Sequence, residues 1–74
     1  MQIEAKKVNE ETIKGIGDSY VLLYDKSHVY TFENLIKAIN LFSDCGWMCI
    51  NMSVATFGER LGEEHVMYAL MKRI

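Results

Sequence analysis

The dipeptide Gly46-Trp47 constrains the fold more than any other feature of this chain, because a helix-like pattern ends there and a strand-like pattern begins. Before it, apolar residues recur at the spacing of a buried helix face. After it, residues 48–54 alternate between apolar and other side chains. Only glycine adopts the positive φ of a helix-ending position without a steric penalty, so Gly46 predicts the helix stop. Trp47 is then placed to pack over the helix end or to stand on a sheet face.

The helix is predicted over residues 32–44. Thr31 is the expected N-cap, since its hydroxyl can accept a backbone N–H, and Glu33 suits the positive end of the helix dipole. Polar residues fill the side opposite to the apolar stripe. The side chains expected to be buried are Phe32, Leu35, Ile36, Ile39 and Phe42.

Strands are predicted at residues 19–25, 47–55 and 65–73, which are rich in β-branched, aromatic and other apolar residues. The last two strands are expected to form an antiparallel hairpin, because the loop between them (56–64) is short. Residues 28–30 are a candidate for a further short strand.

Residues 1–18 leave two alternatives open, an edge strand or a short helix ending near Gly15. The 74 residues are expected to form a single domain, 1–74, in which 1–18 are an N-terminal extension and 19–74 a β-α-β-β core. The predicted fold class is therefore α+β, with one helix packed on a three- or four-stranded sheet.

The first predicted strand is apolar on both faces. Its side chains alternate in direction, so that two point to one face and three to the other. The two faces carry Val21 and Leu23 on one side and Tyr20, Leu22 and Tyr24 on the other.

The second predicted strand is expected to place Met48, Ile50, Met52 and Val54 on one side. One helix covers only one face of a sheet, so the second face needs residues 1–18 or another molecule. We expect another molecule, either a second copy (a homodimer or a larger assembly) or a protein partner. A core this small supplies little stability by itself, which also favours association.

The charge of the chain disfavours several classes of partner. Eight basic and ten acidic residues are interspersed and leave a net charge of −2. Nucleic acids and anionic membranes both require a basic face, so neither is expected. The N-terminal residues lack the apolar core of a signal peptide, and the apolar run 20–24 is too short to span a bilayer. The two cysteines suit a reducing compartment, and the expected location is cytoplasmic.

Residues with metal-binding or catalytic chemistry do not form a convergent set. His28, Cys45, Cys49 and His65 could be combined into a zinc site, since Cys-x3-Cys spacing occurs in such sites. However, Cys45 belongs to the helix end and Cys49 to the strand, and we expect no metal. The negative end of the helix dipole also disfavours a reactive thiolate at Cys45. Without a nucleophile beside a base, the sequence predicts no catalytic residue and favours a non-enzymatic protein without a cofactor.

The order of these elements resembles a widespread group of very short bacterial proteins that form a domain family of unknown function. Its members show a strand, a helix ending in Glu-Gly-Trp-Glu-Leu, a second strand, and a last strand ending in aromatic-x-x-x-Lys-Arg. Residues 19–74 follow this order through Gly46-Trp47 and the ending Tyr68-Ala69-Leu70-Met71-Lys72-Arg73, with Cys45 where the family has Glu. The resemblance implies a β-α-β-β fold and gives no information about activity.

The strand order is also similar to that of the dodecins, small flavin-binding proteins that assemble into hollow dodecamers. In dodecins a Trp at the start of the second strand stacks on the flavin, and Trp47 occupies that position. Their last strand carries a Gln that hydrogen-bonds the flavin, whereas this chain has Tyr68-Ala69 where Tyr-Gln would be expected. The resemblance makes Trp47 and Tyr68 candidate cofactor-binding residues. The main expectation is a non-enzymatic, homo-oligomeric binding or adaptor module, and the alternative is a dodecin-like flavin-binding protein.

Overall fold

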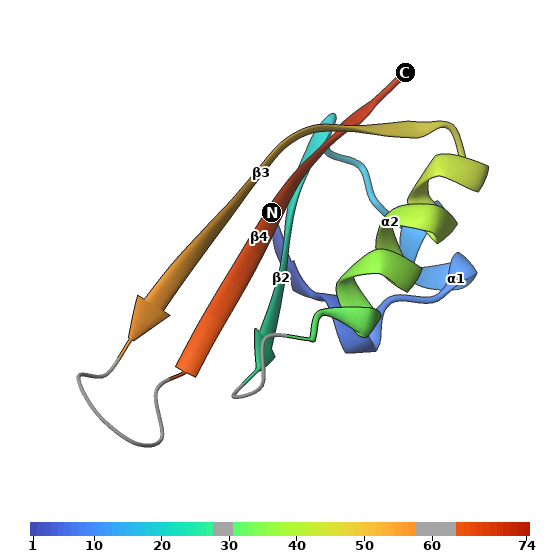
Figure 1. The fold of residues 1–74 in the computed structure, drawn as a ribbon. Helices are drawn as coiled ribbons and strands as arrows, with labels where there is room; N and C mark the ends of the chain where they lie inside the picture. The colour runs from blue at the N-terminus through green and yellow to red at the C-terminus, as the bar shows by residue number, and fades with distance from the viewer. Residues whose placement is uncertain (28–30, 58–63) are drawn as a thin grey trace.

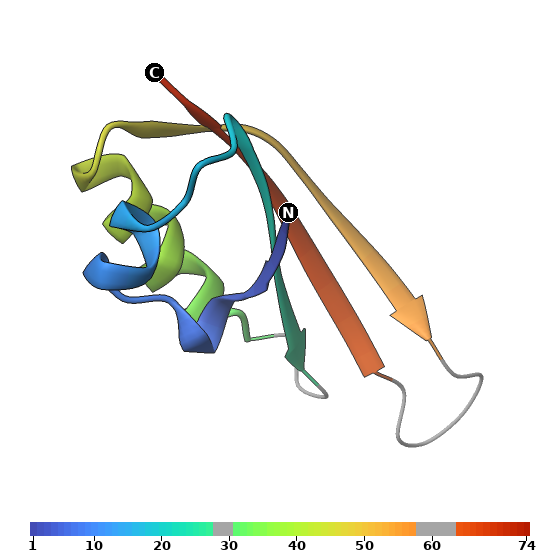
Figure 2. The ribbon, with the colours of Figure 1, turned by 180° about the vertical axis from the view of Figure 1, so that it is seen from behind.

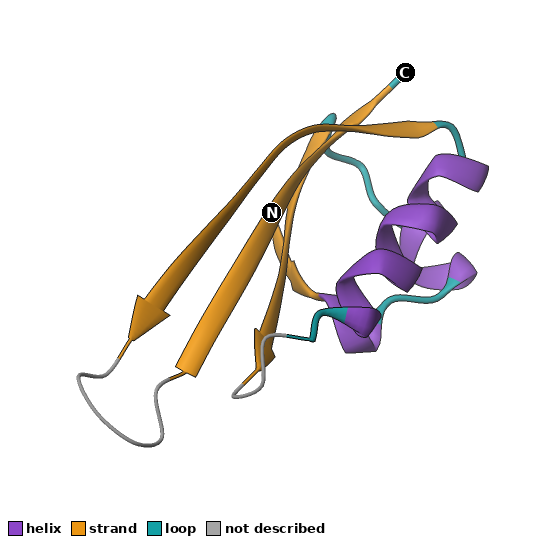
Figure 3. Cartoon of the chain, viewed as in Figure 1, coloured by secondary structure: helices purple, strands orange, loops and turns teal. Residues whose placement is uncertain are grey.

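The computed structural model of the chain describes residues 1–27, 31–57 and 64–74. It is an α+β structure in which a four-stranded mixed sheet packs against a helix (Figure 1 and Figure 3), as the sequence predicts. The predicted strand at 28–30 and the centre of the predicted loop lie outside the described residues. In chain order the elements are β1 (Gln2–Glu4), the 3-10 helix η1 (Ala5–Lys7), α1 (Glu10–Lys14), β2 (Tyr20–Ser27), α2 (Glu33–Asp44), β3 (Trp47–Phe57) and β4 (Glu64–Arg73).

The strands lie side by side in the order β1-β2-β4-β3. β3 and β4 form the antiparallel hairpin that the short connection predicts, and β2 pairs antiparallel with the other side of β4. β1 pairs in parallel with the outer edge of β2, with Ile3 opposite Leu23. The N-terminal segment therefore contributes the fourth strand of the sheet.

Both alternatives for residues 1–18 occur, one after the other. The strand β1 is followed by η1 and then by α1, whose N-cap Asn9 accepts the Thr12 N–H at 2.8 Å. Ala5 and Ile13 of this segment are buried in the same core cluster as the α2 side chains. η1 and α1 lie on the same side of the sheet as α2 (Figure 1 and Figure 2), so the helical layer is confined to one face.

The helix stop is where the sequence places it. α2 ends at Asp44, and the Cys45 N–H donates to the carbonyls of Leu41 and Phe42 at 3.2 and 3.0 Å. Gly46 follows with a φ of 87°, which confirms the prediction of a left-handed stop. Because this residue reverses the chain direction, β3 can begin at once.

The buried face of α2 differs from the predicted stripe mainly at Ile36, and Ile39 is only partly buried. Leu35 and Phe42 are fully buried as expected, but Ile36 is 57% exposed, so the prediction that it lies in the core is wrong. The buried face extends instead to Ala38, which is also buried and which the predicted stripe did not include. Ile36 lies about 100° around the helix from Leu35, on the side away from Ala38.

The start of α2 is capped from β2. The prediction that Thr31 is the N-cap is wrong. The N-cap residue is Phe32, whose side chain does not cap the helix. The buried Asp25 of β2 accepts the Leu35 N–H at 3.3 Å through its Oδ2 atom. Leu35 lies in the first turn, where backbone N–H groups have no partner within the helix. A carboxylate distant in sequence thus performs the capping role.

A β-bulge divides β3. The register against β4 shifts between Cys49 and Asn51, and the Cys49 thiol donates to the Asn51 carbonyl at 3.5 Å. Met48 lies opposite Lys72, whereas Met52 lies opposite Ala69, and these two β4 positions face opposite sides of the sheet. The prediction that Met48 and Met52 share a side is therefore wrong, because the bulge adds one residue and reverses the alternation.

Substitutions on α2 should separate the buried stripe from the exposed side. Leu35→Ala should lower the free energy of unfolding by about 2–5 kcal/mol, because it removes a fully buried side chain. Ile36→Ala should change it by less than about 0.5 kcal/mol, because this side chain lies mostly in water. Urea denaturation measures both values, and equal losses would contradict the observed rotation of the helix.

The long-range cap predicts a loss at Asp25. Asp25→Ala should reduce stability by about 1–2 kcal/mol, because the Leu35 N–H loses its acceptor in a buried setting. Asp25→Asn keeps a side-chain oxygen and should lose less. The matched control is Asp44→Ala at the opposite end of α2, where removing a negative charge near the negative dipole end should cost nothing. Thermal and urea unfolding of the three variants test the cap.

Gly46→Ala should reduce stability by about 1 kcal/mol or more, because a Cβ strains a residue held at φ 87°. The control is Gly17→Ala, since Gly17 has no such φ and a Cβ built there meets nothing within 4 Å. Circular dichroism during thermal unfolding compares the two variants. Equal melting temperatures would show that the helix stop does not depend on glycine.

Candidate functional site

Trp47, the first candidate cofactor contact, is part of the core. Its side chain is 2% exposed and meets the Phe42 ring in an edge-to-face arrangement, with ring centres 5.2 Å apart. The guanidinium carbon of Arg73 also lies 4.6 Å from the centre of the Trp47 ring. Trp47 thus packs over the end of α2, as one reading of the sequence predicts. Its ring offers no open face for stacking on a ligand.

Tyr68, the second candidate, lies on the opposite face of the sheet. In the register of β4, Tyr68 stands across from Tyr24 of β2 and Ser53 of β3. Trp47 stands across from Arg73, an odd-numbered position of β4 that faces the other side. The sheet therefore separates the two candidates, and they do not form one site.

The sheet face away from α2, named here the open face, carries a group of large apolar side chains from three strands. Tyr20 and Met48 are 48% and 46% exposed, and the others are half-buried. No described helix lies on this face, because η1, α1 and α2 are all on the other side (Figure 2). The members of the group are Tyr20, Leu22 and Tyr24 of β2, Met48 of β3, and Tyr68 and Leu70 of β4.

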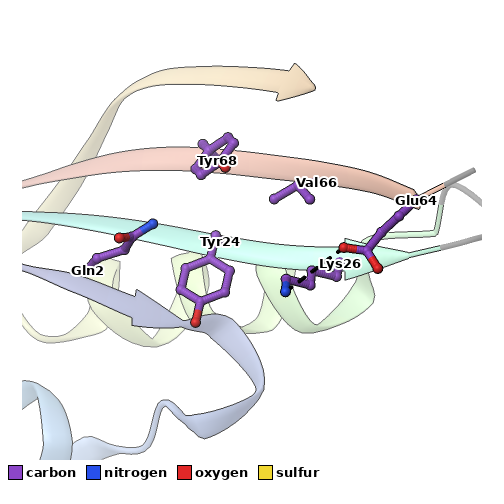
Figure 4. Close-up of a pocket in the computed structure, with 6 residues that line it drawn as sticks. All are labelled: Gln2, Tyr24, Lys26, Glu64, Val66 and Tyr68. Carbon is purple, nitrogen blue, oxygen red and sulfur yellow. Dashed lines mark ion pairs between the residues drawn. The ribbon is translucent and has the colours of Figure 1, made fainter. Parts of the chain in front are cut away.

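The open face has a hollow where the C-terminal end of β2 lies beside the N-terminal end of β4 (Figure 4). The hollow has a volume of about 430 Å³ and combines two phenol rings, an ion pair and a buried valine. Lys26 Nζ lies 3.9 Å from Glu64 Oε1, and both side chains are partly exposed, so this pair adds little stability. The residues that line the hollow are Gln2, Tyr24, Lys26, Glu64, Val66 and Tyr68.

The hollow combines aromatic, aliphatic and charged side chains. Tyr24 and Tyr68 lie directly across from each other on adjacent strands and offer flat apolar rings with hydroxyl groups. Val66 also lines the hollow, although it is only 3% exposed. Among the described residues that line the hollow, the other polar groups are the side-chain amide of Gln2 and the Lys26–Glu64 pair. Such a surface can hold an apolar or aromatic side chain of another protein.

The residues considered for a zinc site are not gathered within the described ranges. Cys45 and Cys49 are free, half-buried thiols, one at the end of α2 and the other in the bulged strand. Residues 1–27, 31–57 and 64–74 contain no group of three or more potential ligands placed to hold a metal ion. His28 lies outside these ranges.

In the part of the chain that the structure describes, no helix combines the length and the hydropathy needed to cross a bilayer.

Compared with models of known protein families and with curated proteins, the chain matches none. The resemblances to the short bacterial family and to the dodecins therefore remain predictions.

Sequence reasoning identified the aromatic face of β2 but missed the hollow. The alternation of β2 and β4 already places Lys26 and Glu64 on the same face as Tyr24 and Tyr68, so this signal was present in the sequence. Gln2 gave no signal, because it reaches the hollow only through the parallel pairing of β1 with β2. Parallel partners distant in sequence leave no local pattern.

Proposed function

We propose that this protein is a non-enzymatic, homo-oligomeric binding or adaptor module whose contact surface is the open face. The observation that supports it most directly is the placement of the N-terminal segment. That segment packs with α2, so Tyr20, Leu22 and Tyr24 keep no covering layer in the described chain. A monomer in water rarely leaves such a group in one patch.

The composition of the open face suits a protein contact. Tyrosine and methionine are enriched at the centres of protein interfaces, and charged residues are depleted there. On the open face, Lys72 stands at one end, 6.0 Å from the centre of the Tyr20 ring, and the Lys26–Glu64 pair stands at the other. The apolar group lies between these charges, in the manner of an interface core with a polar rim.

Self-association would also supply burial that the chain lacks. A domain of this length buries only about 60% of the surface of its unfolded chain. In a two-fold contact between two open faces, the same residues of both copies would be removed from water. A different protein with a complementary apolar surface could dock in the same place, which is the adaptor role.

The flavin-binding alternative has less support from the geometry. Stacking on a flavin needs an accessible aromatic face, whereas Trp47 is enclosed by Phe42 and Arg73. A cytoplasmic location belongs to the present proposal and is favoured by the free thiols of Cys45 and Cys49, which suit a reducing compartment.

Tyr24→Asp should weaken self-association, because it places a charge in an apolar contact. Light scattering on the purified chain at micromolar concentration should give at least twice the 8.5 kDa chain mass for the native protein and a lower mass for the variant. The matched control is Ile36→Asp, which adds the same charge at an exposed apolar residue of α2, on the other side of the molecule, and should keep the native mass.

The same samples distinguish the alternatives by their absorbance. A colourless oligomer supports the binding-module proposal, while visible flavin absorption with a much larger mass would support the dodecin-like alternative. A native protein that stays monomeric at high concentration would overturn self-association through the open face.

A further inference from the structure

β3 forms one edge of the sheet and has the composition of a pairing strand. It runs for 11 residues and pairs with β4 on one side, and no other described strand lies beside it (Figure 1). Proteins protect edge strands by short length, charged side chains or proline. β1, the opposite edge, is 3 residues long and includes Glu4. β3 contains no Asp, Glu, Lys, Arg or Pro. A β-bulge can also protect an edge strand, and β3 has one between Cys49 and Asn51.

The hydrogen-bond alternation of β4 identifies which backbone groups of β3 face the free edge. Successive residues of a strand direct their N–H and C=O groups to alternate neighbours. At the end of β4, the Arg73 N–H donates to Ser19 O next to β2, and the Ile74 N–H donates to Gly46 O next to β3. Even-numbered residues of β4 therefore bond with β3.

Beyond the bulge, this rule leaves a regular set of free backbone groups. The even-numbered Tyr68 stands opposite Ser53, so Ser53 bonds with β4. Met52 and Val54 stand opposite odd-numbered residues of β4, so their N–H and C=O groups point away from the sheet. Their side chains are 49% and 43% exposed, so a second strand could reach this edge and also gain apolar contacts.

We propose that residues 51–57 of β3 pair antiparallel with the same residues of a second copy, around a two-fold axis at Val54. The proposal rests on the proposed self-association. It adds a contact at the β3 edge, separate from the contact through the open face. In this register Val54 faces Val54 of the other copy, and residue 52 faces residue 56. These are the positions whose backbone groups point outward, so both strands present donors to acceptors. The result is one continuous sheet of two copies.

The uncharged side chains of β3 make a second copy a better partner for this edge than a charged strand. A strand without charges meets no like charge when it pairs with itself. Antiparallel self-pairing is also closed, since the same residues are used on both copies, so the edge contact by itself joins two copies and no more. The bulge at Cys49–Asn51 sets the limit of the contact, because it bends the strand before the straight segment begins.

Amide hydrogen exchange resolved by residue tests the register in the native chain. At dilute concentration, Ser53 should be protected by β4 while Met52 and Val54 exchange quickly. At concentrations where light scattering gives the oligomer, the amides of Met52 and Val54 should become protected as well. An oligomer in which these two amides still exchange quickly would overturn edge pairing. If Tyr24→Asp dissociates that oligomer, the proposal of self-association through the open face still stands. A chain that is monomeric at all concentrations would overturn both.

Val54→Pro gives an independent test, because it removes an outward N–H that β4 does not use. The dimer dissociation constant should rise by about tenfold or more, since the substitution removes a hydrogen bond from each copy at the two-fold axis. Val54→Thr keeps the N–H and the branched shape and should leave the constant within about threefold. Native-like association of a folded Val54→Pro variant would overturn the proposal. If that variant does not fold, the exchange pattern of the native chain decides.

Discussion

The side chain of Arg73 connects parts of the molecule that are far apart in the sequence. Its guanidinium group lies over the Trp47 ring and donates hydrogen bonds to the backbone carbonyls of Ile16 and Asp18. Trp47 in turn packs against Phe42 at the end of α2. The end of β4, the start of β3, the end of α2 and the turn after α1 therefore meet around one cation. A cation–π contact is worth about 0.5–2 kcal/mol, so its main effect here is to fix the positions of these four segments.

The uncovered face of the sheet is a consequence of this arrangement. Arg73 holds the turn after α1 at the edge where β4 ends, and Ile13 and Ile16 of the adjoining segment pack into the core beside α2. The N-terminal residues are thereby committed to the helical side. Had they crossed the other face, they would have covered Tyr20 and Tyr24. The same packing that completes one core thus leaves the second apolar face of β2 and β4 without a covering helix in the described residues.

The local elements of this fold could be predicted from the sequence, and the long-range ones could not. Gly46 sets the helix stop by its own backbone freedom, and the alternation of β2 separates its buried side from the open face. The exposure of Ile36 depends on how α2 packs against the sheet and against η1, which the apolar stripe alone does not reveal. The cap of α2 comes from Asp25 on a neighbouring strand, and the hollow needs the parallel pairing of β1. Each of these depends on a contact between segments that are distant in the chain.

β3 shows how one strand can serve the core and the surface at once. Before the bulge, Trp47 and Cys49 face the helical layer, where Trp47 is almost completely buried. After the bulge, the segment beyond Asn51 extends past α2 as an exposed edge. A single added residue reverses the alternation, so the second half does not have to continue the core pattern of the first. The burial of Trp47 anchors the strand, and the exposed half can therefore carry apolar side chains and free backbone groups without being needed for the core.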